Sequence, residues 1–334
     1  MKGLKKLTLA TAIAAAPFAA NAELKALDDT SMGNVTGQAG VTIELAAKVD
    51  IAEVTYQDEG YLAMSGVSVG AGDWAAGATA SQQSALSDVK LYIDVVGGGG
   101  IGDTGALAIG STYIAGAVAQ YTAAGGTAAW SDTGNNDVTM PAVEDGDLVI
   151  GLRSISGDPV NYGIGIDSVK LASSDEGDTS TGGAGLGNLG GTTGTTLISD
   201  LKISGLLGPV DVVIQENSNE MNINAYFNAS GTLKADFVGT YLDFELHNRR
   251  GADSNNLTKD GTIDTSYAHA QVDIGLGTPA ALGAPAEALA FNVNNFSGDL
   301  DLTNIRMGDA ANPSIGSLYM TDLKVNAQMT IYGH

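Results

Sequence analysis

Three short groups of acidic residues are the side chains in this sequence best placed to do chemistry. They lie at residues 144–147, at residues 175–178 and at Asp299 with Asp301. Carboxylate oxygens that converge from a turn are the ligands that calcium prefers. None of the groups has the spacing of a helix–loop–helix calcium site, and acidic chains also place Asp and Gly in ordinary turns. We therefore expect no cofactor and assign no metal ligand, with calcium as the alternative.

The sequence shows none of the residue patterns that are typical of an enzyme. Its three histidines, His247, His269 and His334, are not spaced to bind one metal from a single element. Cysteine is absent, and so are the G-x-S-x-G and H-E-x-x-H motifs of serine hydrolases and zinc proteases. We predict that the protein is not an enzyme and name no catalytic or cofactor-binding residue. A site assembled from distant strands would leave no such pattern.

The chain begins with a segment typical of a secretory signal peptide. Lys2, Lys5 and Lys6 precede an apolar stretch at residues 7–20, and A-N-A at residues 20–22 is a typical cleavage site. Removing these 22 of the 334 residues leaves 312 and changes the formal charge from −23 to −26, because three lysines are lost. We expect export by the Sec pathway to the periplasm, the outer surface or the extracellular medium.

The composition limits the partners and the stabilising bonds of the exported chain. Without cysteine it has no disulfide bond and no lipid attached to a thiol. Charged residues make up 16% of the chain and hydrophobic residues 44%, which favours a folded chain over a disordered one. The acidic excess repels a phosphate backbone, so we expect no nucleic-acid partner.

Apolar and polar residues alternate through most of the sequence after residue 40, which is the pattern of β-strands. Residues 41–51, 89–95, 221–227 and 323–331 show it most clearly. Such a strand buries one face, so we expect the apolar residues of each segment to face a core. The predicted fold class is all-β, with elongated, mostly antiparallel sheets in a sandwich or prism. A degenerate β-solenoid is the alternative, and one short N-terminal helix is expected in either case.

We divide the chain into a signal peptide at residues 1–22, a helical motif at residues 23–40 and a single extended β domain at residues 41–334. Two Gly- and Thr-rich segments lie within the β domain, near residues 122–146 and 172–196. They contain too few apolar residues to order themselves, so we expect surface loops there.

A pattern of one Asp, Asn or Ser, one aliphatic residue, one base and one aliphatic residue recurs along the chain. Its copies start at Asp88, Ser168, Asp200, Asn304 and Asp322. We interpret the first residue as a turn before a strand and the base as a side chain on a solvated outer face. The alternative is a row of bases that binds an acidic ligand. A slip in the alternation also predicts a β-bulge near Asp167.

The segment after the signal peptide has the pattern of a short capped helix. Asp28 is a typical N-cap, Leu27 and Met32 are spaced to make an apolar contact across it, and Gly37 is suited to end the helix. We interpret this segment as an assembly or docking motif made of Leu27, Asp28, Asp29, Met32, Val35, Thr36, Gly37, Gln38 and Gly40.

The letters L-K-A-L-D-D-T-S-M-G-N-V-T-G-Q-A-G-V-T-I-E-L, at residues 24–45, resemble the start of the FilA-like family of pilus-system proteins of Gram-negative bacteria. Residues 316–334 are similar to the end of that family. The resemblance implies a secreted surface or pilus-associated protein and supplies no catalytic residue. The positions that match the family motif are Asp28, Asp29, Val35, Thr36, Gly37, Gln38 and Gly40.

The sequence favours a structural protein of the cell surface, a pilus- or fibre-associated (fimbrial) subunit. Long strands at both ends of the chain are suited to complete a neighbour's sheet, with copies of the same chain or with other pilus-system or surface proteins as partners. The candidate pairing residues are Val41, Ile43, Leu45, Leu323, Val325, Met329 and Ile331. The alternatives are an outer-membrane β-barrel, for which outer-membrane association is expected, and a calcium-assisted adhesin or binding module.

Overall fold

The computed structural model describes residues 40–72, 83–96, 127–130, 144–156, 159–251, 254–259, 262–279 and 286–332. The chain divides into two compact units, Met1–Ala39 and Gly40–His334, and every described residue belongs to the second unit. The predicted N-terminal helix, and the docking motif up to Gln38, lie outside the described residues. Within the described ranges, no helix has the length and apolar character needed to span a membrane.

The main sheet has thirteen strand segments, which form an up-and-down meander of eight long strands. Five of these strands are split into two consecutive segments, and each strand pairs antiparallel with its neighbours in the chain. In chain order the strands are β1 (Val41–Ala47) with β2 (Val49–Gln57), β3 (Tyr61–Gly70) with β4 (Leu86–Val95), β6 (Leu148–Ser154) with β7 (Val160–Ala172), β8 (Thr195–Ile214), β9 (Met221–Phe227) with β10 (Ala229–Ala235), β11 (Thr240–His247) with β14 (Ala268–Gly277), β15 (Ala288–Met307) and β16 (Gly316–Ile331).

The all-β, mainly antiparallel fold that the sequence predicts is confirmed. The arrangement is a meander of neighbouring antiparallel strands, rather than the coils of the alternative β-solenoid. A second sheet has three strands, in the order β13 (Thr262–Thr265), β12 (Asn255–Lys259) and β5 (Thr127–Trp130). β12 and β13 belong to the segment that separates β11 from β14.

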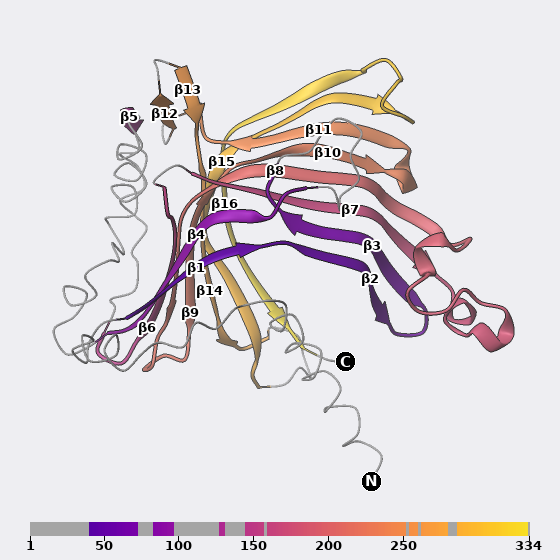
Figure 1. Cartoon of the computed structure of the whole chain (residues 1–334), viewed down its shortest axis with the longest axis horizontal. Helices are drawn as coiled ribbons and strands as arrows, with labels where there is room; N and C mark the ends of the chain where they lie inside the picture. Colours follow the sequence, from indigo (N-terminus) through magenta and orange to yellow (C-terminus); the bar gives the residue numbers. More distant parts are fainter. Residues whose placement is uncertain are drawn as a thin grey trace, which may run out of the picture. The chain divides into compact units, whose positions relative to one another are not determined.

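The meander has two halves, which share its longest strands (Figure 1). The β1 half contains β1, β4, β6, β9 and β14, and the β2 half contains β2, β3, β7, β10 and β11. β8, β15 and β16 run from one half into the other. β8, for example, pairs with β7 and β10 in its first part and with β6 and β9 in its second part.

β-Bulges mark the line where the two halves meet. The pairing register shifts at Asp88 in β4, between Leu207 and Val210 in β8, and at Asp322 in β16. Asp88 and Asp322 adopt φ angles of 65° and 55°, in the left-handed region that Asp tolerates better than most residues. A bulge bends its strand, and bulges on neighbouring strands bend the sheet as a whole.

A second line of bulges crosses the β2 half. Asp200 in β8 and Asn304 in β15 have φ angles of 52° and 50°, and register shifts accompany both. Four of the five copies of the recurring sequence pattern, all except the copy at Ser168, therefore begin with a residue in the left-handed conformation inside a strand. Our interpretation as turns before strands was wrong, because Asp and Asn supply the same local conformation to a bulge as to a turn. No register shift supports the bulge predicted near Asp167: β7 keeps its register with β3 and β8 across residue 167, and the shift between Val169 and Lys170 comes from one extra residue in β8.

The two faces of the meander differ in chemistry and in exposure. In β9, Asn222, Asn224 and Tyr226 are buried, whereas the alternate apolar residues are only half-buried. The alternation of burial is similar in β6, in the second part of β8 and in β14. There the less buried of the alternating positions are occupied mainly by Val, Ile, Leu and Ala. We call the half-exposed side the apolar face and the other side the polar face. The expectation that the apolar alternate residues face a core was wrong, because alternation shows which residues share a face and not which face is covered.

Residues 173–194, predicted as a surface loop, are tied to the polar face of the β2 half. They form three short 3₁₀ turns, η6 (Ser174–Gly177), η7 (Thr179–Thr181) and η8 (Leu189–Gly191). Glu53 of β2 accepts hydrogen bonds from the backbone N–H groups of Gly187 and Gly190, at 2.8 and 2.9 Å. The buried ammonium group of Lys170 donates to the carbonyl oxygens of Gly190 and Thr192. These ionic hydrogen bonds add to the apolar contacts of Leu189, which is fully buried in a cluster with Tyr61, Ala63 and Ala172. The base of this pattern copy, Lys170, is therefore not on a solvated face.

Candidate functional site

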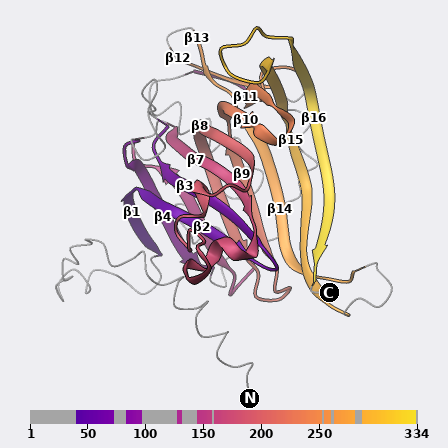
Figure 2. The ribbon, with the colours of Figure 1, turned by 90° about the vertical axis from the view of Figure 1, so that its right-hand side faces the viewer.

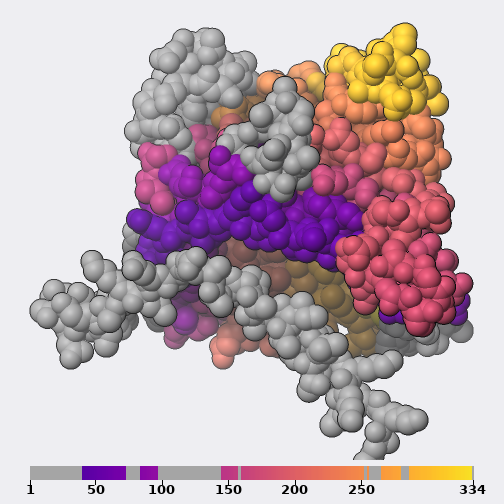
Figure 3. Space-filling model, turned by 45° about the vertical axis from the view of Figure 1, so that its right-hand side comes forward, coloured from indigo at the N-terminus to yellow at the C-terminus, as the bar shows by residue number. Residues whose placement is uncertain are grey.

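The first edge of the meander is made by β1 and β2, which pair on one side only among the described strands. β1 pairs with β4, and β2 pairs with β3. Nearly all side chains of the two strands are exposed on both faces, including Ile43 at 42%. Figure 3 shows these N-terminal strands, in indigo, as a band on the surface. The predicted strand at residues 41–51 is therefore present but has no buried face, because it is the outermost strand.

The second edge is β16, whose described pairing is with β15 alone. Figure 2 shows β16 at one side of the sheet and β1 at the other. Most of its side chains are exposed, and Val325 is exposed at 36%. The predicted C-terminal strand is present, and it too lies at an edge rather than over a core.

The structure places all seven candidate pairing residues on these two edges. Val41, Ile43 and Leu45 belong to β1, and Leu323, Val325, Met329 and Ile331 belong to β16. All of them lie on the apolar face, since their cross-strand neighbours are the apolar residues of β4 and β15. Gly40, the one docking-motif residue described, starts the β1 edge. An added Cβ there would lie 2.6 Å from the carbonyl oxygen of Ile93, so glycine allows the close approach to β4.

Both edges lack most of the protection that soluble proteins use against pairing with another chain. Soluble proteins protect exposed edges with proline, with several lysines, with inward-pointing charges, with β-bulges or with a short strand. β1, β2 and β16 contain no proline and one lysine, Lys324, and a second lysine, Lys48, lies between β1 and β2. Of these devices, β16 has a bulge at Asp322. β16 alone extends over 16 residues. By these criteria both edges are suited to accept a further strand.

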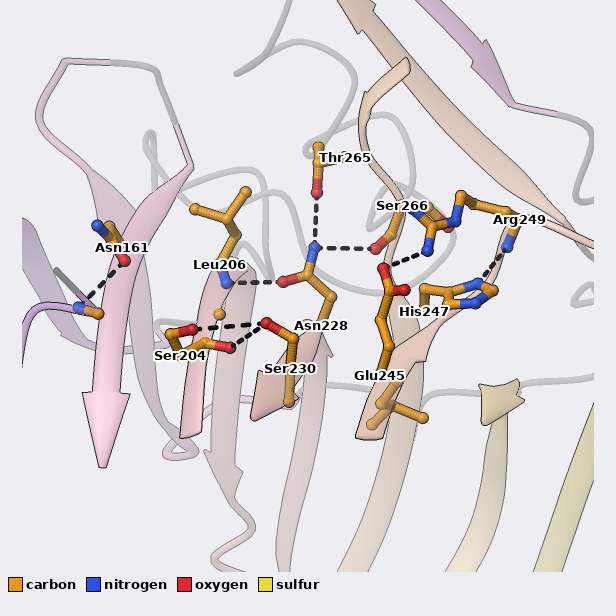
Figure 4. Close-up of a pocket in the computed structure, with 14 residues that line it drawn as sticks. Asn161, Ser204, Leu206, Asn228, Ser230, Glu245, His247, Arg249, Thr265 and Ser266 are labelled. Carbon is orange, nitrogen blue, oxygen red and sulfur yellow. Dashed lines mark hydrogen bonds and ion pairs between the residues drawn. The ribbon is translucent and has the colours of Figure 1, made fainter. Parts of the chain in front are cut away.

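A polar pocket of about 310 Å³ lies where the two halves meet (Figure 4). Ser204 and Ser230 line one side of it, and Glu245, His247 and Arg249 line the other. Asn228 lies between them, at the junction of β9 and β10. Its side chain accepts a hydrogen bond from the backbone N–H of Leu206 and donates to Thr265 Oγ1 and to the Ser266 carbonyl oxygen, at 2.8 to 3.1 Å. The hydrogen-bonding groups of this side chain are thus used within the chain.

His247 lies beside the pocket in a buried ionic network. Its Nε2 is 3.1 Å from Asp301 Oδ2, and its Nδ1 is 3.3 Å from Asp299 Oδ2 and accepts from the Arg249 backbone N–H. The guanidinium of Arg250 binds both oxygens of Asp301, at 2.5 and 3.0 Å. This contact lowers the pKa of Asp301 and raises that of Arg250. Because both imidazole nitrogens are engaged and the ring is buried, His247 is not placed to act as an open general base.

The same residues offer a partial set of metal ligands. One ligand atom each from Glu245, His247 and Asp301 lie within 4.8 Å of one another. However, Arg249 forms an ion pair with Glu245, and Arg250 forms one with Asp301. The guanidinium groups therefore already neutralise the carboxylates that a divalent cation would need, and the donor set does not fit a cation without displacing them.

The other two acidic groups also have roles within the chain. Asp147 is buried, and its oxygens accept the backbone N–H groups of Glu144 and Glu216 at 2.8 and 2.9 Å. Asp178 caps η7 by accepting from the Ser180 N–H at 2.8 Å, which lowers its pKa together with a hydrogen bond from the Ser180 side chain. Calcium binding stays a prediction that these contacts do not support.

Buried polar side chains form rows across the polar face of the β1 half. Asp211, Asn224, Gln271 and the half-buried Asn295 face one another on β8, β9, β14 and β15. Asp211 is fully buried and forms a 2.7 Å ion pair with Arg153 of β6. The alternation in the sequence did not indicate these residues, because the polar positions of an alternating strand are usually solvated. The excess of Asn and Gln over Lys and Glu at those positions was the available signal, since amides are buried more readily than charges.

His269 is a buried, neutral member of this polar face. Its Nε2 is 2.6 Å from Asn224 Oδ1, Asn295 Nδ2 is 3.2 Å from its Nδ1, and the ring stacks on Tyr226 at 4.4 Å. One donor and one acceptor satisfy the neutral imidazole, and burial lowers the pKa of His269 to about 4. The side chain therefore contributes packing and hydrogen bonds at neutral pH, but no charge.

Comparison with known proteins gives one match. The profile of a family of unknown function, DUF6160, matches residues 1–97, which include β1 to β4. No curated protein and no solved structure matches the chain. The chain is thus similar to DUF6160 over its N-terminal part, which contains the predicted docking motif and the first edge of the meander.

Replacing Arg250 with Ala should destabilise the fold by about 2–4 kcal/mol, because two buried carboxylates lose their cation. The matched control is Arg249→Ala, which removes only the exposed ion pair with Glu245 and should cost less than about 1 kcal/mol. Denaturant unfolding of both variants measures the difference. Equal losses of stability would contradict the assignment of Arg250 as the cation of the network.

Acid should destabilise the fold through His269. Between pH 6.5 and pH 4 the unfolded chain binds a proton at this imidazole and the folded chain does not, so stability is complete above pH 6.5 and falls as the pH approaches 4. At pH 4.5 the loss should be roughly 2–3 kcal/mol. His269→Gln should lose less stability than the wild type between pH 7 and pH 4.5 in denaturant unfolding. An identical pH dependence in the two proteins would show that His269 does not titrate as a buried neutral group.

Proposed function

We propose that this chain is an exported, non-enzymatic structural protein of the cell surface, a pilus- or fibre-associated subunit whose copies join through their sheet edges. The observation that carries the proposal is the pair of long, proline-free edges with exposed apolar residues, β1 with β2 at one end of the meander and β16 at the other. The predicted signal peptide and the resemblance to FilA-like pilus-system proteins support the cellular location.

Strand addition is the interaction that these edges favour. An added strand would receive main-chain hydrogen bonds along the edge, while alternate side chains set its register. The edge residues Ile43 and Val325 would each gain an apolar cross-strand neighbour, and such a pair contributes roughly 0.2–1 kcal/mol. A contact repeated along 16 residues of β16 sums many such terms without any deep pocket.

The interior chemistry favours a structural role over catalysis. His247 and His269 are buried and hydrogen-bonded to groups of the same chain, and Arg250 neutralises Asp301. These networks resemble the internal connections of a rigid scaffold, in which each polar group is satisfied by a neighbour. A rigid sheet whose edges keep their shape is what repeated strand pairing requires.

Substituting Ile43 or Val325 with Lys should weaken self-association of the exported protein by tenfold or more, because lysine on an edge strand opposes pairing. Leu186→Lys is the matched control, since Leu186 is 63% exposed but lies in the loop between η7 and η8. Sedimentation velocity over a concentration series, with electron microscopy of the same samples, measures assembly. Circular dichroism verifies that each variant keeps its strands.

Monodisperse monomers of the wild type at all concentrations would contradict the proposal. So would an equal loss of assembly in the edge variants and in Leu186→Lys, because a general loss of solubility would then explain the result. Assembly that is retained in both edge variants would show that copies join through another surface.

A second function, association with the outer membrane, is favoured by the apolar face. Its residues are half-exposed in β6, β9 and β14, where the alternate residues of the polar face are mostly buried, and strands that face lipid alternate in this sense. Leu276 and Leu289 face each other on β14 and β15 and are 68% and 45% exposed. In this function the apolar face would contact acyl chains rather than another protein.

If this second function holds, the wild-type protein should bind vesicles of zwitterionic phospholipid. Binding would transfer the apolar side chains of this face from water into lipid, which is favourable. The Leu276→Glu/Leu289→Glu variant should then bind at least about tenfold less, since each Glu would carry a charge into the lipid. Ile315→Glu is the control, because Ile315 is 67% exposed but lies outside the strands. Flotation in a density gradient measures binding. Protein that stays at the bottom of the gradient would exclude this function.

A further inference from the structure

One row of facing residues crosses the entire meander. Its members, from the first edge to the last, are Ile43, Leu91, Leu152, Val210, Ala225, Ala270, Phe296 and Val325. All eight are apolar and lie on the apolar face. Ile43 and Val325 are thus the two ends of a single row, and a second copy placed beside the first could continue it.

The bends of the two edge strands restrict how a second copy could be placed. In β1 the register shift begins after Leu45, two residues from Ile43, and in β16 the shift that contains Asp322 begins beyond Leu323, two residues from Val325. A further shift between Val325 and Ala327 comes from an extra residue in β15 and leaves β16 itself without a bulge there. A bent strand adds to a bent edge only where the two bends coincide, because elsewhere its hydrogen-bonding groups leave the edge. Aligning the bends therefore places Ile43 opposite Val325 and Leu45 opposite Leu323.

This register also matches charge. Because β1 and β16 are the first and last of eight alternating strands, they run antiparallel, and Glu44 then lies opposite Lys324. On its other side Glu44 already faces Lys90 of β4. A displacement of two residues one way would place Glu44 against Asp322, and two residues the other way would place it against Asn326. Opposite charges on facing strands are favourable and like charges are not.

A head-to-tail contact covers both edges of every copy. A two-fold contact of the β1 edge with itself would put Glu44 opposite Lys48 of the second copy, but it would leave β16 of both copies exposed. A heterologous contact repeats without limit unless its rotation closes a ring, and this is the geometry of a fibre.

We infer that copies of this chain join head to tail, with β16 of one copy antiparallel to β1 and β2 of the next, in the register that pairs Ile43 with Val325 and Glu44 with Lys324. The partner is thus a second copy of the same chain, and the contact extends the sheet and its apolar rows across the interface. This inference rests on the proposed function, to which it adds the direction and register of assembly.

Charge reversal tests the register. Glu44→Lys and Lys324→Glu should each raise the concentration for half-maximal assembly about fivefold, because an attractive pair becomes repulsive. The double variant Glu44→Lys/Lys324→Glu should return within about twofold of the wild type. Lys48→Glu is the matched control and should have little effect. Sedimentation of the exported, full-length products gives all four values.

Disulfide cross-linking tests whether copies join head to tail. The chain has no native cysteine, so every disulfide must form between introduced cysteines. Ile43→Cys and Val325→Cys chains, mixed under mild oxidation, should form a disulfide-linked dimer, because facing antiparallel residues lie within the distance that a disulfide spans. Neither variant should form such a dimer alone. A chain that carries both substitutions should form a ladder of linked multimers.

The outcomes separate this inference from the proposed function. No assembly by the wild type would overturn both. A contact between two β1 edges would give a different set of results. Lys324→Glu would then leave assembly unchanged, Glu44→Lys would abolish it, and Glu44→Lys/Lys48→Glu would restore it. These results would leave assembly through the sheet edges intact, but they would overturn the head-to-tail contact. Dimers of Ile43→Cys chains alone would overturn it as well, as would a disulfide within one doubly substituted chain, because β1 would then meet its own β16.

Discussion

Backbone hydrogen bonding at the ends of the meander is the constraint on which this structure depends. Each inner strand pairs on both sides, so its N–H and C=O groups have partners within the sheet. β1, β2 and β16 have strand partners on one side only among the described residues. Their outward groups must bond to water or to another strand, and the strands contain no proline that would oppose pairing with another strand.

Two lines of bulges give the edges a defined shape. Asp88 and Asp322 bend the sheet where its halves meet, and Asp200 and Asn304 shift the pleat across the β2 half. Only a few residue types accept the left-handed conformation, so the bulges occur at fixed points of the chain. A flat edge could pair with another strand in any register. A bent edge can pair in only a few registers, because the added strand must bend at the same point. The buried rows of Asn, Gln and Asp on the polar face hold the curved strands to one another.

The fold class followed from the sequence more readily than the functional surfaces did. Alternation located most strands, as at Met221–Phe227, because a period of two is a local property. It could not show that Asn222 and Asn224 are buried, since burial depends on which elements lie against each face. A local sequence pattern also could not predict that residues 173–194 are held against the sheet. That attachment depends on hydrogen bonds to Glu53, which lies more than a hundred residues earlier in the chain. The candidate pairing residues lie on the two edges, where their exposure was not foreseen, and their pairing with another chain stays a prediction.

The central claim is that the two edges, rather than the polar pocket, are where this protein meets its partner. Amide hydrogen exchange followed by mass spectrometry, on separated and on assembled protein, tests it most directly. The account predicts slower exchange on assembly in β1, β2 and β16, with the strands between them unchanged, because only edge amides gain partners. Protection that appears around the pocket or in the inner strands, with both edges unchanged, would contradict it.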